Sequence, residues 1–180
     1  DVERHAPDGD EIPIKIHTTT VTRTDCGLRS ADFYLPRLLT GLRRPKRRIL
    51  GMELAGEIEA IGRKVTRFKP GDKVFASTYD VNFGGHAEYK CLPENGVLAT
   101  KPAALSFEEA AAAPGAGMTA MACLSKAKIQ PGQKVLVYGA SGAVGTNAVQ
   151  LASRHDLDQK LGVTLRQAGL FQNVAGNHHV

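Results

Sequence analysis

The glycine-rich segment Tyr138-Gly-Ala-Ser-Gly-Ala-Val-Gly145 constrains the fold of this chain more than any other stretch of its sequence. It follows the β-rich run Lys134–Tyr138 and precedes residues 146–153, which are typical of a helix. A strand that turns tightly into a helix through small residues leaves the first amides of the helix available to an anion. Gly142 would let the backbone approach a pyrophosphate, and Gly145 would let the helix pack closely on the strand. The segment therefore predicts a dinucleotide-binding turn.

The expected cofactor contacts come from this turn. Ala140 stands where the usual fingerprint has its first glycine, so a plain glycine-rich turn is the alternative interpretation. The strand before the turn and the helix after it favour the dinucleotide. The side chain that normally selects between NAD and NADP would fall near residues 160–166, where Lys160 and Arg166 do not discriminate. We expect the cofactor to contact Gly139, Ala140, Ser141, Gly142, Ala143, Val144 and Gly145.

The character of the sequence changes near residues 100–105. Before this point, short alternating or β-branched runs are separated by turn signals such as Lys69-Pro-Gly-Asp72, which predicts a small β-barrel or sandwich. Pro13 places the first of these strands at a sheet edge or at a strand start. After this point, Ser106-Phe-Glu-Glu109 has the pattern of a helix capping box, and a second helix is expected from Pro114 to about Ala127. The buried strand and glycine turn follow, which completes an α/β rhythm.

Composition excludes several classes of protein. The net charge is +5 and hydrophobic residues make up 42% of the 180 residues, as in ordinary globular proteins. The basic run Arg43–Arg48 has no interleaved aromatic residues, which favours a solvated loop over a nucleic-acid interface. No stretch is long and apolar enough for a membrane span. The cysteines, Cys26, Cys91 and Cys123, form no CxxC motif, and their odd number indicates reduced thiols in a cytoplasmic protein.

From about Glu11 to Ala152 the chain resembles the medium-chain dehydrogenase/reductase superfamily, and within it the zinc-free quinone oxidoreductase-like branch. Six segments in the family's order carry the resemblance: Arg23–Arg29, Gly51–Gly62, Phe68–Phe75, Gly84–Tyr89, Pro114–Ala120 and the glycine turn. The resemblance implies a GroES-like β-barrel over residues 1–102, which is the substrate and catalytic domain. The first part of a Rossmann domain would follow over residues 103–152, and a tail without an assigned structure over residues 153–180.

The resemblance also implies site residues. Zinc-dependent relatives have ligands at the positions of Thr22 and Met52, which do not bind zinc here, so no metal is expected. Cys26 is expected to be a buried thiol. Thr119 would lie beside the nicotinamide, or its hydroxyl would simply bond back to the preceding helical turn. Thr22 and Glu53 would line the substrate pocket, although an acidic residue at a strand start is just as often solvated. No catalytic residue is assigned.

The resemblance implies an NAD(P)H-dependent, zinc-independent oxidoreductase that reduces a small quinone or enone by direct hydride transfer. NADPH is expected over NADH, which is not excluded. The alternative is a shortened, non-catalytic family member that serves as a binding module. Too few residues follow Gly145 for a whole Rossmann domain, so the chain is a fragment, a set of segments joined across gaps, or a true truncation. We expect no turnover from these 180 residues alone, and an open sheet edge that favours a homodimer or aggregation.

Overall fold

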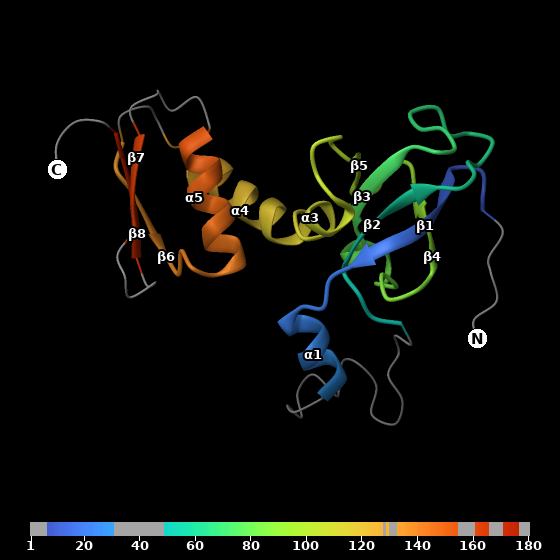
Figure 1. Cartoon of the computed structure of the whole chain (residues 1–180), viewed down its shortest axis with the longest axis horizontal. Helices are drawn as coiled ribbons and strands as arrows, with labels where there is room; N and C mark the ends of the chain where they lie inside the picture. Colours follow the sequence, from blue (N-terminus) through green and yellow to red (C-terminus); the bar gives the residue numbers. More distant parts are fainter. Residues whose placement is uncertain are drawn as a thin grey trace. The chain divides into compact units, whose positions relative to one another are not determined.

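The computed structural model describes residues 7–30, 49–127, 129, 133–154, 161–165 and 171–176. Figure 1 shows the whole chain, which divides into two compact units between Pro114 and Gly115. The basic run Arg43–Arg48, Lys160 and Arg166 lie outside the described residues. Within the described ranges, none of the helices is both long and apolar enough to cross a lipid bilayer.

The first unit is built on a curled antiparallel sheet with the strand order β4-β1-β2-β3-β5 (Figure 1). Its strands are β1 (Glu11–Thr19), β2 (Glu53–Ile58), β3 (Lys73–Ser77), β4 (Tyr89–Pro93) and β5 (Leu98–Thr100). Its helices are α1 (Arg23–Ser30), the 3₁₀ turn η1 (Tyr79–Val81) and α3 (Phe107–Ala111). The β-rich character expected for this part of the chain is confirmed.

The core of this unit follows the alternation of its strands. Successive strand side chains point to opposite faces of the sheet, so every second residue can be buried. The side chains of Ile12, Ile14, Leu54, Ile58, Val74 and Leu92 are at most 2% exposed and pack in one cluster. Burial of such side chains stabilises the fold by about 1.5–3 kcal/mol each, before the cost of ordering the chain.

The edge position expected from Pro13 is wrong, whereas the strand-start position is right. β1 lies between β4 and β2, and Pro13 is its third residue, opposite Cys91 of β4. The carbonyl of Pro13 still accepts a hydrogen bond from Glu59 N at 3.0 Å. A proline is tolerated in this inner strand because it lies close to the point where the strand begins.

Helix α3 has the capping box that the sequence predicts. The hydroxyl of Ser106 accepts from Glu109 N at 3.1 Å, and the Glu109 carboxylate accepts from Ser106 N at 2.8 Å. The helix packs Ala110 and Ala111 against Ala55 of β2. It therefore belongs to the packing of the first unit.

The second unit contains α4 (Pro114–Ala127, of which Pro114 belongs to the first unit), β6 (Val135–Tyr138), α5 (Ala143–Arg154), β7 (Leu161–Leu165) and β8 (Phe171–Gly176). The two predicted helices at Pro114 and after the glycine turn are confirmed. β6 pairs antiparallel with β8, which pairs antiparallel with β7. Only five residues separate β7 from β8, and a parallel pair would need a longer crossover.

Strand β6 is buried on one face only. Val135 and Val137 pack with Ala140, Val149 and Ala152 under α5. On the other face, Leu136 is 61% and Tyr138 is 73% exposed. The expectation of a buried strand therefore fails for Leu136 and Tyr138.

Candidate active site

The first candidate site is the turn from β6 into α5. Gly139 has a φ of +72°, a left-handed conformation that favours glycine, and its carbonyl accepts from Gly142 N at 3.0 Å. Thr146 N donates to the Gly142 carbonyl at 2.9 Å, and the Thr146 hydroxyl donates to the Ala140 carbonyl at 3.0 Å. The amides that precede Thr146 have no acceptor inside the helix, which is the arrangement that binds anions.

The two later glycines of the turn differ in their surroundings. A Cβ on Gly145 would lie 2.2 Å from the Gly139 carbonyl oxygen, so the close packing of helix on turn requires glycine there. A Cβ on Gly142 would meet only that same oxygen, at 3.4 Å. Apart from this oxygen, the space beside Gly142 is open.

The remaining residues of the turn can offer different groups. The side chain of Ala140 is 2% exposed, so only its main chain can reach a ligand. Ser141, Gly142 and Ala143 are exposed, and Val144 is 40% exposed. Their assignment to the cofactor stays a prediction.

Thr119 lies on α4 with its side chain exposed. Its hydroxyl donates to the Gly115 carbonyl at 2.8 Å, which is the back-bonded arrangement named above as its alternative role. A hydroxyl in this arrangement keeps its oxygen lone pairs available, so contact with a nicotinamide also stays a prediction.

The second candidate site is a cluster in the first unit, which we call the barrel cluster: Thr20, Thr22, Asp25, Gly51, Glu53, Thr78 and His86. Asp25 is its most connected member, with 3% of its surface exposed. Its Oδ2 accepts from the Thr22 hydroxyl at 2.7 Å and from Thr22 N at 2.9 Å. Its Oδ1 accepts from Gly51 N at 3.0 Å. One carboxylate therefore joins the start of α1 to the turn before β2.

The environment of Asp25 favours its charged form. Burial raises the pKa of this carboxyl, but hydrogen bonds from the Thr22 hydroxyl and from the amides of Thr22 and Gly51, together with the charge of His86, lower it by more. The net pKa is below the ordinary value. Asp25 is therefore an ionised acceptor around neutral pH.

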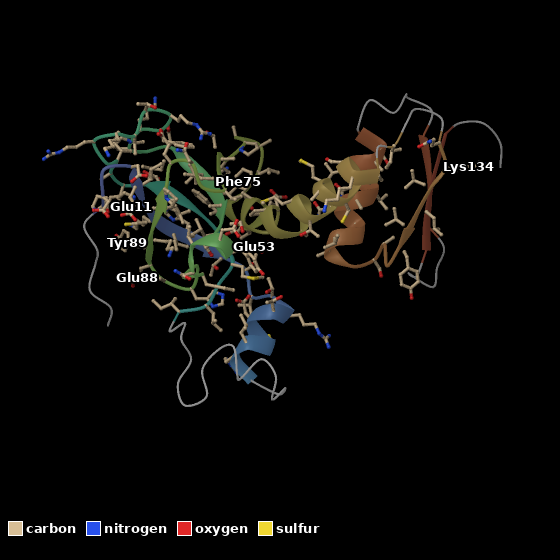
Figure 2. All side chains as sticks on the ribbon, turned by 180° about the vertical axis from the view of Figure 1, so that it is seen from behind. Glu11, Glu53, Phe75, Glu88, Tyr89 and Lys134 are labelled. Atoms are coloured by element: carbon tan, nitrogen blue, oxygen red, sulfur yellow. The ribbon has the colours of Figure 1, made fainter. Side chains whose placement is uncertain are left out.

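Glu53 begins β2 and is 6% exposed, which rules out the solvated alternative (Figure 2). Its carboxylate accepts a hydrogen bond from the Thr20 hydroxyl, and its main-chain carbonyl accepts from the Thr19 hydroxyl at 2.8 Å. Thr22, the other expected pocket residue, is half-buried at the start of α1, where its carbonyl accepts from Cys26 N. Asp25 links Thr22 to Gly51, which precedes Glu53 by two residues in the chain.

Gly51 is the residue at which several hydrogen bonds of the barrel cluster meet. It has a φ of +93°, and a Cβ there would lie 2.5 Å from His86 N. Its carbonyl accepts from the Thr78 hydroxyl at 2.8 Å and from Gly85 N at 3.0 Å. The backbones of Gly51 and of Gly85–His86 and the side chain of Thr78 therefore meet at a position that only glycine fits.

The imidazole of His86 is half-buried, and its Nε2 lies 2.9 Å from the Thr20 carbonyl oxygen. A carbonyl oxygen only accepts, so Nε2 carries a proton. Sequence reasoning assigned no role to His86 or to Asp25. The spacing Thr22-x-x-Asp25 is that of a helix cap and was a usable signal for Asp25, whereas His86 had none.

Cys26 is exposed, so the expectation that it is a buried thiol is wrong. It lies on the solvent side of α1, while Asp25 occupies the buried side. Cys91 is half-buried and Cys123 exposed, and all three are free thiols. Within the residues that the structure describes, no three His, Cys, Asp or Glu side chains are grouped to hold a metal ion.

Comparison with known proteins places this geometry in a family. Residues 8–103 match the alcohol dehydrogenase GroES-like domain. The quinone oxidoreductase of Sus scrofa is 34% identical over 184 aligned residues, which cover 100% of this chain and 52% of that protein. This chain thus spans about half the length of the curated relatives that it matches.

Solved structures give the same result. An alcohol dehydrogenase superfamily protein from Novosphingobium aromaticivorans has a TM-score of 0.73 at 31% identity, covering 84% of this chain and 45% of that one. The CurK enoyl reductase has a TM-score of 0.72 at 28% identity, with the same coverage. The expected fold class, a GroES-like barrel followed by part of a Rossmann domain, is confirmed.

Proposed function

Because this chain belongs to the medium-chain dehydrogenase/reductase superfamily, in its quinone oxidoreductase-like branch, we propose that it forms the substrate-binding half of an NADPH-dependent, zinc-independent reductase. The proposed substrates are quinones and conjugated carbonyls, in keeping with relatives named quinone oxidoreductase and enoyl reductase. In this proposal residues 1–102 bind the substrate, residues 103–152 begin the dinucleotide domain, and the tail 153–180 has no assigned role. The protein acts in the cytoplasm, and its open sheet edge supports a homodimer.

The turn from β6 into α5 carries the proposal. The Gly145 position is closed to any side chain by the Gly139 carbonyl, while the space beside Gly142 is open. This combination suits a dinucleotide, whose pyrophosphate needs close approach to the backbone and to the helix amides. The residues proposed to hold the cofactor are Thr119, Gly139, Ala140, Ser141, Gly142, Ala143, Val144 and Gly145.

A bound reduced nicotinamide would supply the hydride for the reduction. The chain's own residues orient the substrate and handle the proton. Thr22 and Glu53 are proposed to line the substrate pocket, each with its polar atoms fixed by hydrogen bonds to neighbours in the barrel cluster. Without a metal, groups of this kind must stabilise the charge that develops on the substrate oxygen.

The test uses a chimaera in which residues 1–152 are joined to the second half of the Sus scrofa relative. The chimaera is expected to bind NADPH more tightly than NADH and to reduce 9,10-phenanthrenequinone. Gly142→Val places a branched side chain in the open space and is expected to abolish NADPH binding. Gly27→Val is the control, because nothing lies within 4 Å of a Cβ there. Unchanged NADPH affinity in the Gly142→Val chimaera would show that the turn is not the cofactor site.

The 180-residue chain itself is expected to bind NADPH weakly and not to turn over. Hydride transfer requires the reacting atoms to be held about 3–3.5 Å apart, which half a cofactor site cannot ensure. NADPH oxidation with the quinone is followed at 340 nm, on a chain verified by mass spectrometry at 19.2 kDa. Saturable turnover by that chain would overturn this expectation.

A further inference from the structure

The first unit contains a cavity whose lining includes no residue of the barrel cluster. The cavity measures about 310 Å³, which is at the lower end of the range for small-molecule sites. Its walls are the end of β3, the turn η1, the end of β4 and the turn that leads from β4 into β5. All of these segments belong to one compact unit, so the cavity is a feature of the barrel itself.

Hydrogen bonds fix the walls of this cavity to one another. The amide of Ser77 donates to the Val97 carbonyl at 3.0 Å, which joins the end of β3 to the turn before β5. The Nζ of Lys90 donates to the Val81 carbonyl at 3.1 Å, which joins β4 to η1. The cavity therefore exists before a ligand enters it, and binding there requires little ordering of the chain.

The backbone that follows η1 is strained. Asn82 and Phe83 have φ values of +61° and +65°, and Gly84 follows at +101°. A left-handed conformation is uncommon for phenylalanine and persists only where surrounding contacts impose it. Phe83 is 2% exposed, and its amide donates to the Thr78 carbonyl at 2.9 Å. Strain of this kind is concentrated at ligand sites, and this segment begins directly after Val81, which lines the cavity.

Much of the lining is apolar and comes from Val81, Leu92, Pro93 and Val97. Leu92 is 2% exposed and belongs to the core of the unit, so this wall is closely packed. Contact of a hydrocarbon group with such a wall removes apolar surface from water on both sides, which favours binding. The cavity therefore fits a ligand with an apolar body.

The polar side chains of the lining are those of Ser77, Asp80 and Asn95. Asp80 is the charged residue among them, and it forms no ion pair with any described lysine, arginine or histidine. The nearby Lys90 binds the Val81 carbonyl instead, and burial lowers the pKa of its amine. The carboxylate, amide and hydroxyl oxygens of the lining all accept hydrogen bonds, and an ammonium group has three to donate. An ammonium group therefore complements the polar part of the cavity.

We propose that this cavity is a second ligand site of the chain, which binds a small apolar molecule carrying a protonated amine. The apolar body of the ligand lies against Leu92 and Val97, and its ammonium group donates to the Asp80 carboxylate. An ammonium group that enters a partly enclosed space needs such a countercharge, because it leaves part of its hydration behind. The proposal does not depend on the proposed reductase function.

The first experiment titrates the 180-residue chain near pH 7 with 2-phenylethylamine, 2-phenylethanol and 3-phenylpropanoate, and follows the backbone amides by ¹⁵N NMR. The three probes share an apolar body and are cationic, neutral and anionic, respectively. We expect the amine to bind at least about tenfold more tightly than the alcohol, and the carboxylate to bind more weakly than both. The amides that shift should be those of residues 77–81 and 92–97, whereas the amides of Gly51 and His86 should not move.

The second experiment repeats the titrations with Asp80→Asn, which keeps the shape of the side chain and removes its charge. This change should weaken binding of 2-phenylethylamine to the level of 2-phenylethanol and leave the affinity for the alcohol unchanged. Asp8→Asn is the matched control, because Asp8 is an exposed carboxylate of the same unit that does not line the cavity. It should leave the affinity for all three probes unchanged.

Equal affinities for the amine and the alcohol, or an amine affinity that Asp80→Asn leaves unchanged, would overturn the assignment of the ammonium group to Asp80. Absence of binding by all three probes, or shifts centred on the amides of Gly51 and His86, would overturn the site itself. None of these results bears on the proposed reductase, which is tested separately with NADPH and a quinone on the chimaera.

Discussion

Replacement of Gly51 by alanine tests how tightly the barrel cluster is built. Two separate penalties apply to this change. The φ of +93° disfavours any residue with a Cβ, at a cost of about 1–2 kcal/mol. The added methyl group would also lie 2.5 Å from His86 N, 2.6 Å from His86 Cδ2 and 2.8 Å from the Gly85 carbonyl carbon. Relieving such overpacking typically costs about 1–3 kcal/mol more.

Gly71→Ala separates the two penalties. Gly71 has nearly the same φ, +88°, but nothing lies within 4 Å of a Cβ there. It carries the backbone penalty of about 1–2 kcal/mol without the steric one. The free energy of unfolding should therefore fall by about 1–3 kcal/mol more in Gly51→Ala than in Gly71→Ala.

The assay is urea unfolding of both variants and the wild type, followed by far-UV circular dichroism, with the amide of Gly51 observed by hydrogen exchange. We expect Gly51→Ala alone to speed exchange at residue 51, because the bond to Asp25 would lengthen as the backbone moves. Equal stability losses in the two variants would refute the steric reasoning and leave only the backbone conformation as a cause.

Three further predictions follow from the contacts described above. Asp25→Asn should lower the free energy of unfolding by about 1.5–3 kcal/mol near pH 7. Because the pKa of Asp25 is depressed in the folded protein, the stability advantage of the wild type should be present above about pH 4 and vanish as the pH falls further. Urea titrations that show a constant difference in stability from pH 7 to 3 would contradict this. Gly145→Ala should disrupt the turn between β6 and α5 while Gly142→Ala leaves it intact, which amide chemical shifts in the second unit would report; equal disturbance by both would count against the packing described for Gly145. Elemental analysis of the purified chain should find far less than one zinc per molecule, and one tightly held zinc would disprove the metal-free site.

Local rules were enough to predict much of the fold. The box from Ser106 to Glu109 and the helix start at Pro114 depend on residues within one turn of each other, and the structure has both. The burial of β6 was beyond such rules. Whether Leu136 and Tyr138 are covered depends on which elements pack over them, and the apolar run itself carries no sign of this.

The barrel cluster shows the same limit to prediction from local sequence rules. Thr22 and Glu53 were predicted as pocket residues through family resemblance, and both lie in the barrel cluster. The contacts that organise them join Asp25 to Gly51 and His86 to Thr20, across 26 and 66 residues of sequence. No periodicity or turn rule connects positions that far apart, so the link between them is visible only once the strands are paired.

Helix α1 has eight residues, fewer than an isolated helix needs to be stable in water. Its first turn is held by Asp25, the same carboxylate that fixes the Gly51 amide. Winding of this helix and fixing of the Gly51 amide therefore depend on the same carboxylate, so the proposed substrate pocket is coupled to the helix. On warming, the proposed pocket should lose its affinity for a quinone when α1 frays, at a temperature below the melting of the strands of the first unit. The temperature range over which the site binds would then be limited by the stability of one short helix. The barrel would stay folded above that range.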